Sequence, residues 1–195
     1  MAKKPTPITR GQSQVRIIGG QWRSRKVNVP DAPGLRPTPD RVRETLFNWL
    51  APYIQGARVL DAFCGSGAVF LEAMSRGASN GLALDLNADA TNNLRANLAL
   101  LQCTTATVLK VDALQHLSNN AEQGFDIVLL DPPFHQNLLL DACQLLESNN
   151  WLKQHAWIYT ESEQAPSSLA VPSTWRLHRE KRSGQVHYAL WQKHG

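Results

Sequence analysis

The 195-residue sequence is 43% hydrophobic and 18% charged, which suits one globular catalytic domain with a short appendage. Its three cysteines form no Cys-x-x-Cys pair and its six histidines lack metal-ligand spacing, so we expect neither a secreted disulfide framework nor a metal site. No apolar run approaches membrane-spanning length and none follows the basic start, so we expect a cytoplasmic protein without a membrane partner.

The net charge of +4 is unevenly distributed. Residues 1–45 hold ten Lys and Arg with three acids, whereas the other 150 residues hold ten with thirteen. A basic head on a slightly acidic body is typical of an enzyme that binds a polyanion, although a solvated basic face is the simpler alternative. Gly19-Gly20 predicts the turn of a hairpin that presents Trp22, a base-stacking aromatic, among cations. The RNA-binding candidates are Arg16, Trp22, Arg23, Arg25, Lys26, Arg36, Arg41 and Arg43.

The apolar spacing of residues 42–50 predicts a helix, which Thr38 or Asp40 could cap. The arginines near its start could hold a substrate phosphate or close over a cofactor, and the sequence does not decide between these. We therefore divide the chain into a basic, RNA-binding extension, residues 1–50, built from the hairpin and this helix, and a catalytic domain, residues 51–195.

A strand, a glycine turn and a helix follow. Residues 58–63 have strand character, and Gly65 and Gly67 turn the chain into a helix over 67–77. Glycines there allow the backbone to approach a ligand closely. The third glycine of the dinucleotide fingerprint would fall at Phe70, so that pattern is incomplete. Asp85 ends the next strand, over 81–86, at the distance expected of an acid that binds ribose hydroxyls.

Four acids end four successive predicted strands. Asp61, Asp85, Asp112 and Asp131 close the strands 58–63, 81–86, 105–111 and 125–130, with helices over 67–77, 88–101 and 113–120 between them. This alternation predicts a parallel sheet with helices on both faces. Ligands bind outside the carboxyl ends of such strands, where the four acids would gather.

Asp131-Pro132-Pro133-Phe134 follows the apolar strand 125–130. Two prolines remove two backbone donors and leave the Asp131 carboxylate and the Pro132 carbonyl as acceptors beside an aromatic ring. These groups suit an exocyclic amino group on a nucleobase, which has two N–H donors and a ring that can stack. A rigid turn without chemistry is the alternative.

The C-terminal third supplies the remaining strands. Residues 156–161 predict a fifth strand, and residues 175–178 and 186–191 predict a hairpin that turns at Ser183-Gly184, which makes seven strands in all. Arg179, Lys181 and Arg182 in this hairpin could touch RNA, but we interpret them first as a solvated turn.

These features resemble a known class of enzyme. The Asp61-x-Phe63-x-Gly65-x-Gly67 loop, Asp85, Asp112 and the Asp-Pro-Pro-Phe tetrad resemble the ordered motifs of S-adenosylmethionine-dependent methyltransferases that modify exocyclic amino nitrogens. The blocks Arg16–Lys26 and Gly34–Asn48 are similar to the RsmD family, which methylates guanine N2 in small-subunit ribosomal RNA. The resemblance covers nearly the whole chain.

The resemblance implies an α/β fold with a Rossmann-like seven-stranded methyltransferase sheet, mostly parallel, with a C-terminal antiparallel hairpin. It also implies S-adenosylmethionine as cofactor, S-adenosylhomocysteine as product and no metal. The partner would be 16S ribosomal RNA, within an assembled or partly assembled particle that can include ribosomal proteins. The implied catalytic residues are Asp131, Pro132, Pro133 and Phe134, and the implied cofactor-binding residues are Asp61, Phe63, Gly65, Gly67, Asp85, Asp112 and Ala113.

Two positions depart from the family pattern. Asn87 stands where a second acid often follows the ribose-binding one, and its amide can still hydrogen-bond a hydroxyl. Cys64 stands where a small residue is usual, and we expect it to pack as a small hydrophobe.

Other functions remain open. The tetrad would serve an adenine-N6 DNA or RNA methyltransferase equally well, and a non-catalytic RNA-binding protein could keep the same fold. A nicotinamide oxidoreductase would account for the glycine turn but leave the tetrad and the basic extension unexplained. Methylation at pyrimidine C5 would require a catalytic cysteine, commonly placed after a proline, and no cysteine follows a proline in this sequence.

Overall fold

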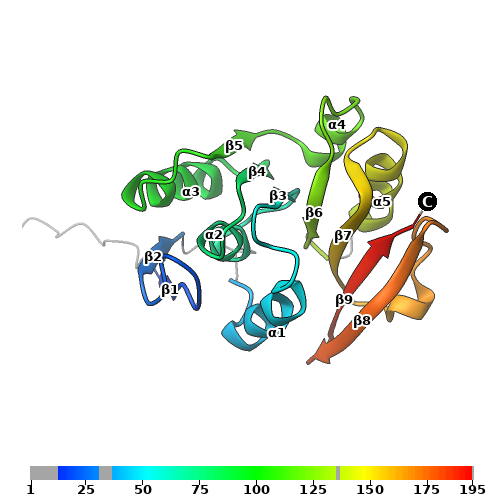
Figure 1. Ribbon diagram of the computed structural model, residues 1–195, viewed down its shortest axis with the longest axis horizontal. Coiled ribbons are helices and arrows are strands. Elements are labelled where there is room, and N and C mark those ends of the chain that lie inside the picture. Colours follow the sequence, from blue (N-terminus) through cyan, green and yellow to red (C-terminus); the bar gives the residue numbers. More distant parts are fainter. Residues whose placement is uncertain (1–12, 31–36, 135–136, 195) are drawn as a thin grey trace, which may run out of the picture.

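A twisted seven-stranded sheet forms the centre of the computed structural model, which describes residues 13–30, 37–134 and 137–194 (Figure 1). The strand order is β5-β4-β3-β6-β7-β9-β8. The strands are β3 (Arg58–Asp61), β4 (Asn80–Asp85), β5 (Ala106–Lys110), β6 (Phe125–Leu130), β7 (Leu152–Ser162), β8 (Trp175–Ser183) and β9 (Val186–Lys193).

The sheet confirms the predicted fold class. Strands β3 to β7 pair in parallel, whereas β9 runs antiparallel to both of its neighbours, β7 and β8. All seven predicted strands are present, and β7 and β8 are longer than predicted. The chain order reverses between β3 and β6, which places the carboxyl ends of these two strands at the switch point where open α/β sheets bind ligands.

Helices cover both faces of the sheet, as the alternation predicts. On one face α1 (Asp40–Leu50), α2 (Ala68–Ser75) and α3 (Ala88–Leu100) contribute to one buried cluster. On the other face α4 (Ala113–Leu117) and α5 (Leu138–Ser148) contribute to a second. Helix α5 was not predicted from the sequence, and α1 begins after Pro39 without the expected side-chain cap. None of the helices in the described ranges is both long and apolar enough to cross a membrane.

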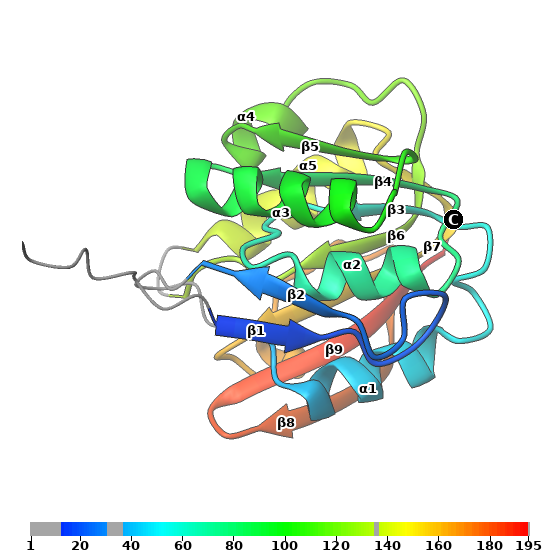
Figure 2. The ribbon, with the colours of Figure 1, turned by 90° about the vertical axis from the view of Figure 1, so that its left-hand side faces the viewer.

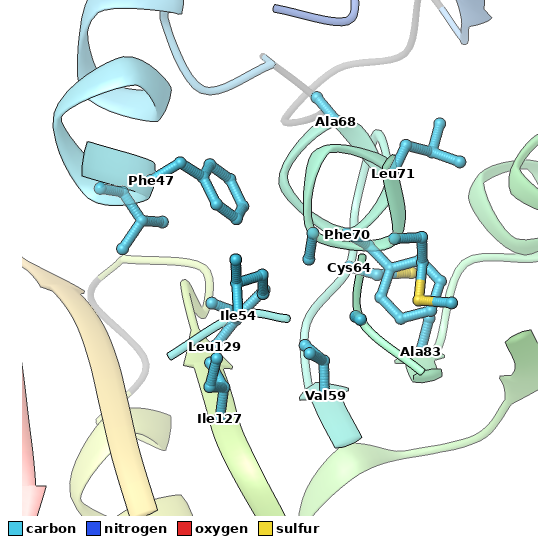
Figure 3. Close-up of a cluster of buried hydrophobic side chains, with 14 of the residues drawn as sticks. Phe47, Ile54, Val59, Cys64, Ala68, Phe70, Leu71, Ala83, Ile127 and Leu129 are labelled. Atoms are coloured by element: carbon cyan, nitrogen blue, oxygen red, sulfur yellow. The ribbon is translucent and has the colours of Figure 1, made fainter. Parts of the chain in front are cut away.

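The first of these clusters fixes α1 and α2 against the sheet. Figure 3 shows Phe47 of α1 and Phe70 of α2 above Val59, Ile127 and Leu129, which come from the central strands β3 and β6. All five side chains are at most 2% exposed. Cys64 is 7% exposed and packs in the same cluster, which is the structural role expected for it. This packing holds the start of α2, and with it the glycine turn, beside the carboxyl end of β3.

The predicted N-terminal hairpin forms a separate two-stranded ribbon, β1 (Ser13–Arg16) and β2 (Lys26–Val29), beside α2 and α3 (Figure 2). Its inward-facing residues Val15, Val27 and Val29 belong to the same buried cluster as α1 and α2. The side-chain amide of Asn97 on α3 donates to the backbone oxygen of Asn28 at 2.8 Å. The extension therefore shares a core with the sheet, and the division at residue 50 stays a prediction.

Candidate active site

Three carboxylates lie on one face of the sheet at the carboxyl ends of three adjacent strands. Asp61 pairs with Leu129 across β3 and β6, and the pairing of Leu130 with Thr160 makes Asp131 and Glu161 the next neighbours across β6 and β7. Because side chains alternate along a strand, Asp61 and Asp131 share the face of Leu129, and Glu161 shares the face of Tyr159. Leu129 and Tyr159 both belong to the α1 and α2 cluster, so the three acids point to that side. We call Asp61, Asp131 and Glu161 the carboxylate row.

Burial raises the pKa of each member of the row. The pKa of Asp61 rises to about 8, mainly through burial and then through the charges of Asp85 and Glu161, although the Phe63 N–H opposes the rise. Burial, Glu161 and Asp61 hold the pKa of Asp131 well above its usual range. Burial also raises the pKa of Glu161, opposed by the hydroxyl of Tyr159. Ionisable groups perturbed in this way cluster at functional sites, and a row of acids favours a cationic or N–H-rich ligand.

The glycine turn packs beside this row. Gly67 has φ +76° and precedes α2, and a Cβ at this position would lie 2.6 Å from the side chain of Leu94. The N–H of Gly65, whose φ is +49°, donates to Oδ2 of Asp85 at 2.8 Å. The other oxygen of Asp85 accepts the N–H of Asn87 at 2.8 Å. Each carboxylate oxygen has a second lone pair, so Asp85 orders the loop and can still accept from a ligand.

Asn87 and Asp112 cap helices. The side-chain oxygen of Asn87 accepts the N–H groups of Asp89 and Ala90 at the start of α3, so it is already engaged as a cap. Asp112 accepts the N–H of Gln115 at 2.9 Å and caps α4, and Ala113 is buried in the first turn. A shallow hollow opens beside this cap, lined by Val111, Asp112, Gln115, His116 and Asn119.

The tetrad lies in the loop that follows β6 and ends in a turn at Phe134. Pro132 is buried and Pro133 is exposed, while the ring of Phe134 is 38% exposed. A half-exposed phenyl ring beside buried carboxylates can stack on a planar ligand. His135, which follows Phe134 in the sequence, lies outside the described residues.

Five of the predicted RNA-binding residues are exposed, namely Arg16, Arg23, Arg25, Lys26 and Arg41, and Arg36 lies outside the described residues. The loop that carries Arg23 and Arg25 meets α2 at its last residue, Ser75, and so lies beside the end of the sheet opposite the acids (Figure 2). The hairpin prediction is confirmed: the oxygen of Gly20 accepts the N–H of Arg23 at 3.2 Å at the start of the turn, and the N–H of Gly19 donates to Glu72 of α2 at 2.8 Å.

Two residues of that set are corrected by their burial. Trp22 is 8% exposed and packs in the core, so its ring does not face solvent for stacking on a base. Its backbone N–H donates to Oγ of Ser75 at 2.9 Å. Arg43 is fully buried, pairs with Asp40 at 2.6 Å and donates to the backbone oxygen of Arg16 at 3.1 Å. Both residues fix the extension to the domain.

A larger hollow of about 480 Å³ lies at the amino ends of β3 and β6, far from the carboxylate row at their carboxyl ends. Tyr53, Asp126, Lys153, His155 and Trp157 help to line it, and the sequence analysis assigned none of them to a site. Lys153 pairs with Asp126 at 2.8 Å, and Tyr53 stacks on Trp157 with ring centroids 4.3 Å apart. Because the oppositely charged Lys153 and Asp126 of this hollow already pair with each other, we place the chemistry at the carboxylate row.

Known proteins are similar to this chain over most of its length. The family described as "Conserved hypothetical protein 95" matches residues 15–192. The chain is 50% identical over 191 residues to ribosomal RNA small subunit methyltransferase D of Escherichia coli K12, covering 98% of this chain and 95% of that protein. It is 47% identical to the protein of the same name from Haemophilus influenzae, covering 98% of this chain and all of the other. The chain belongs to the RsmD family.

The structure also matches a solved RsmD-like fold. The putative methyltransferase yhhF from Escherichia coli superimposes with a TM-score of 0.86 at 49% identity, covering 93% of this chain and 99% of the other. This likeness extends over the sheet and its flanking helices, so the Rossmann-like methyltransferase fold implied by the sequence is confirmed.

Glu161 is the residue of the site that sequence reasoning missed. The sequence placed it at the end of a predicted strand but gave it no role. In this RsmD chain it extends the row of Asp61 and Asp131 by one strand. The sequence did contain a signal for this residue, since an acid at the carboxyl end of a fifth parallel strand lies at the same end of the sheet as the acids of the other four strands.

Proposed function

We propose that the protein transfers a methyl group from S-adenosylmethionine to the exocyclic N2 amino group of a specific guanine in 16S ribosomal RNA, within an assembled or partly assembled particle. The observation that carries this proposal is the Asp131-Pro132-Pro133-Phe134 segment beside the carboxylate row, at the switch point of the sheet. The names of the Escherichia coli and Haemophilus influenzae relatives support a ribosomal RNA substrate.

The residues around the glycine turn suit the cofactor. The open backbone of Gly65 and Gly67 admits close approach, and Asp85 keeps acceptor capacity for ribose hydroxyls. Asp61 is 4% exposed beside other acids, a setting that favours a positively charged group, and Phe63, Asp112 and Ala113 complete the proposed binding set. When bound, S-adenosylmethionine supplies an electrophilic methyl group on a sulfonium.

The chain orients the amino group and accepts its protons. An arylamine is a poor nucleophile because its lone pair is delocalised into the ring, so its alignment by fixed acceptors matters. The Asp131 carboxylate and the Pro132 carbonyl accept the two N–H groups, and Asp131 offsets the positive charge that develops on nitrogen. Phe134 stacks on the base, a contact worth about 1–3 kcal/mol, which offsets part of the cost of extracting it from a helix.

The last hairpin adds cations beside the site. Lys181 pairs with Tyr188, and Tyr188 pairs with Glu161, so Lys181 lies in the same cross-strand row as the catalytic acids. Arg179 lies one row below, opposite Leu190. Residues two apart on a strand share a face, so Arg179 points to the same side of the sheet as Lys181. We therefore revise the solvated-turn interpretation and place RNA phosphates along this face of β8 as well as at Arg41.

The proposal is tested by transfer of tritiated methyl to small-subunit particles from a strain that lacks this protein, followed by nucleoside digestion and chromatography. We expect label in N2-methylguanosine and none with Asp131→Ala, whose cofactor affinity stays nearly normal. Label in N6-methyladenosine would support methyl transfer to an amino group but would show that the target base is adenine. No label in particles or DNA despite cofactor binding would refute the substrate, and lost cofactor binding in Asp131→Ala with normal residual turnover would refute the role of Asp131.

A further inference from the structure

Glu161 is the member of the carboxylate row to which the proposed reaction gives no role. It is 8% exposed at the end of β7, one strand away from Asp131 and on the same face. Cβ atoms of neighbouring strands lie about 5 Å apart, so two such carboxylates can reach adjacent atoms of one ligand. Among the described residues, no group of three or more His, Cys, Asp or Glu side chains is arranged to hold a metal ion.

Tyr159 fixes Glu161 as an acceptor. Its hydroxyl donates to Oε1 of Glu161 at 2.7 Å, and the tyrosine is 1% exposed. Burial and the neighbouring acids raise the pKa of Tyr159 well above its usual range, so its hydroxyl keeps the proton and remains a donor. A hydrogen bond of this kind favours the ionised carboxylate and opposes the burial that raises the pKa of Glu161. Oε2 is then the lone-pair oxygen that Glu161 offers to a ligand.

The two purines differ at the atom next to the amino group. On guanine, the N2 amino group adjoins N1–H, so the reacting edge carries donors side by side. On adenine, the N6 amino group adjoins N1 with a lone pair, so an acceptor follows the donor. Two neighbouring carboxylates match the first pattern, whereas the second would set a lone pair against a carboxylate oxygen. Sites that leave buried polar groups unpaired in this way discriminate strongly.

We propose that Glu161 accepts the N1–H of the target guanine while Asp131 accepts N2–H, so that this pair selects guanine over adenine. The inference rests on the proposed function and names the residue that sets its base specificity. Glu161 is then a direct contact to the base, and Tyr159 is a positioning residue that acts through Glu161.

The test compares two bases that share the reacting amino group. Small-subunit particles are reconstituted with either guanine or 2-aminopurine at the methylated position, once this position has been located in ribonuclease fragments of the tritium-labelled RNA. 2-Aminopurine retains the C2 amino group but has a lone pair at N1. We expect the wild-type protein to prefer guanine by at least about tenfold in kcat/KM. Glu161→Gln places an amide that can donate to N1, so the variant should lose activity on guanine and its preference should fall toward one.

The control variant is Glu180→Gln, the same chemical change at an exposed position of β8, which should keep the wild-type preference. Titration with S-adenosylhomocysteine checks that the variants keep the cofactor site. An unchanged preference in Glu161→Gln, or a wild-type protein that methylates both particles equally, would overturn the inference and leave the proposed function standing. A wild-type protein that methylates neither particle would overturn both.

Discussion

The carboxylate of Glu72 holds the backbone of Gly19 at 2.8 Å, although 53 residues separate them in the chain. Its second oxygen accepts the N–H of Ile18, also at 2.8 Å. Glu72 is fully buried on α2, where it also meets Arg76 at 2.7 Å and Arg43 at 3.5 Å. One acid therefore ties the N-terminal hairpin and α1 to the helix that follows the glycine turn.

Replacing Glu72 with Ala should destabilise the protein by about 3–5 kcal/mol, because the buried guanidinium of Arg43 loses a partner in its ion-pair network. Urea unfolding followed by circular dichroism measures this change. Glu180→Ala, an exposed position on β8, should change stability by less than about 0.5 kcal/mol. Equal stability of the two variants would show that Glu72 does not hold the extension.

Gly20→Ala should also loosen the hairpin. Gly20 has φ +77°, and a Cβ there would lie 1.9 Å from the backbone oxygen of Ser75. A matched control is Gly184→Ala, which has φ +63° but open space around its Cβ and should cost only about 1–2 kcal/mol of backbone strain. We expect Gly20→Ala to cost more than about 3 kcal/mol in the same unfolding experiment. A cost no greater than that of Gly184→Ala would contradict the docking of this turn on α2.

The strands and the acids at their ends could be predicted from the sequence because both depend on local patterns. Asp61, Asp85 and Asp131 each follow an apolar run, and parallel strands bring such positions to one edge. Glu161 ends an equally clear strand, but its role depends on the register that places it beside Asp131.

The roles of Trp22 and Arg43 could not be predicted, because they depend on partners distant in the sequence. An aromatic residue among cations indicates an RNA-binding cluster when only the local sequence is considered, yet the Trp22 side chain packs in the core and its backbone N–H donates to Ser75. Arg43 lies three residues from Asp40, but its burial follows from Glu72, 29 residues further on. Residue type alone indicated charge and aromaticity, and the fold decided which side chains remain exposed.

Lys181→Glu should weaken RNA binding more than Arg182→Glu. The two residues are neighbours on β8, and strand alternation puts Lys181 on the face of the carboxylate row and Arg182 on the other. The variant loses one phosphate contact and reverses the charge of the side chain, so KM for the particle should rise by about tenfold with kcat little changed. The slope of log binding constant against log salt concentration should become shallower by about one. Steady-state kinetics at several salt concentrations measure both effects. Equal KM values for the two variants would show that RNA does not contact this face of β8.

Asp61 should make the protein less stable as the pH rises. Its pKa is about 8 in the folded protein and 3.8 as a free side chain, so between these values the folded state binds more protons than the unfolded state. The free energy of unfolding then falls with pH, by up to about 1.4 kcal/mol per unit from this group. Asp61→Asn removes the titration, so the variant should show a smaller fall between about pH 4 and pH 8.

Urea unfolding at several pH values compares these slopes, with Asp141→Asn, an exposed position on α5, as the control that should follow the wild type. Burial also raises the pKa values of Asp131 and Glu161, so the unfolding free energy of Asp61→Asn should still fall somewhat with pH. A variant whose slope matches that of the wild type would show that Asp61 is ionised at neutral pH without a ligand. The fall in stability is the cost of gathering acids at one edge, and a cationic ligand there should reduce it by favouring the ionised form.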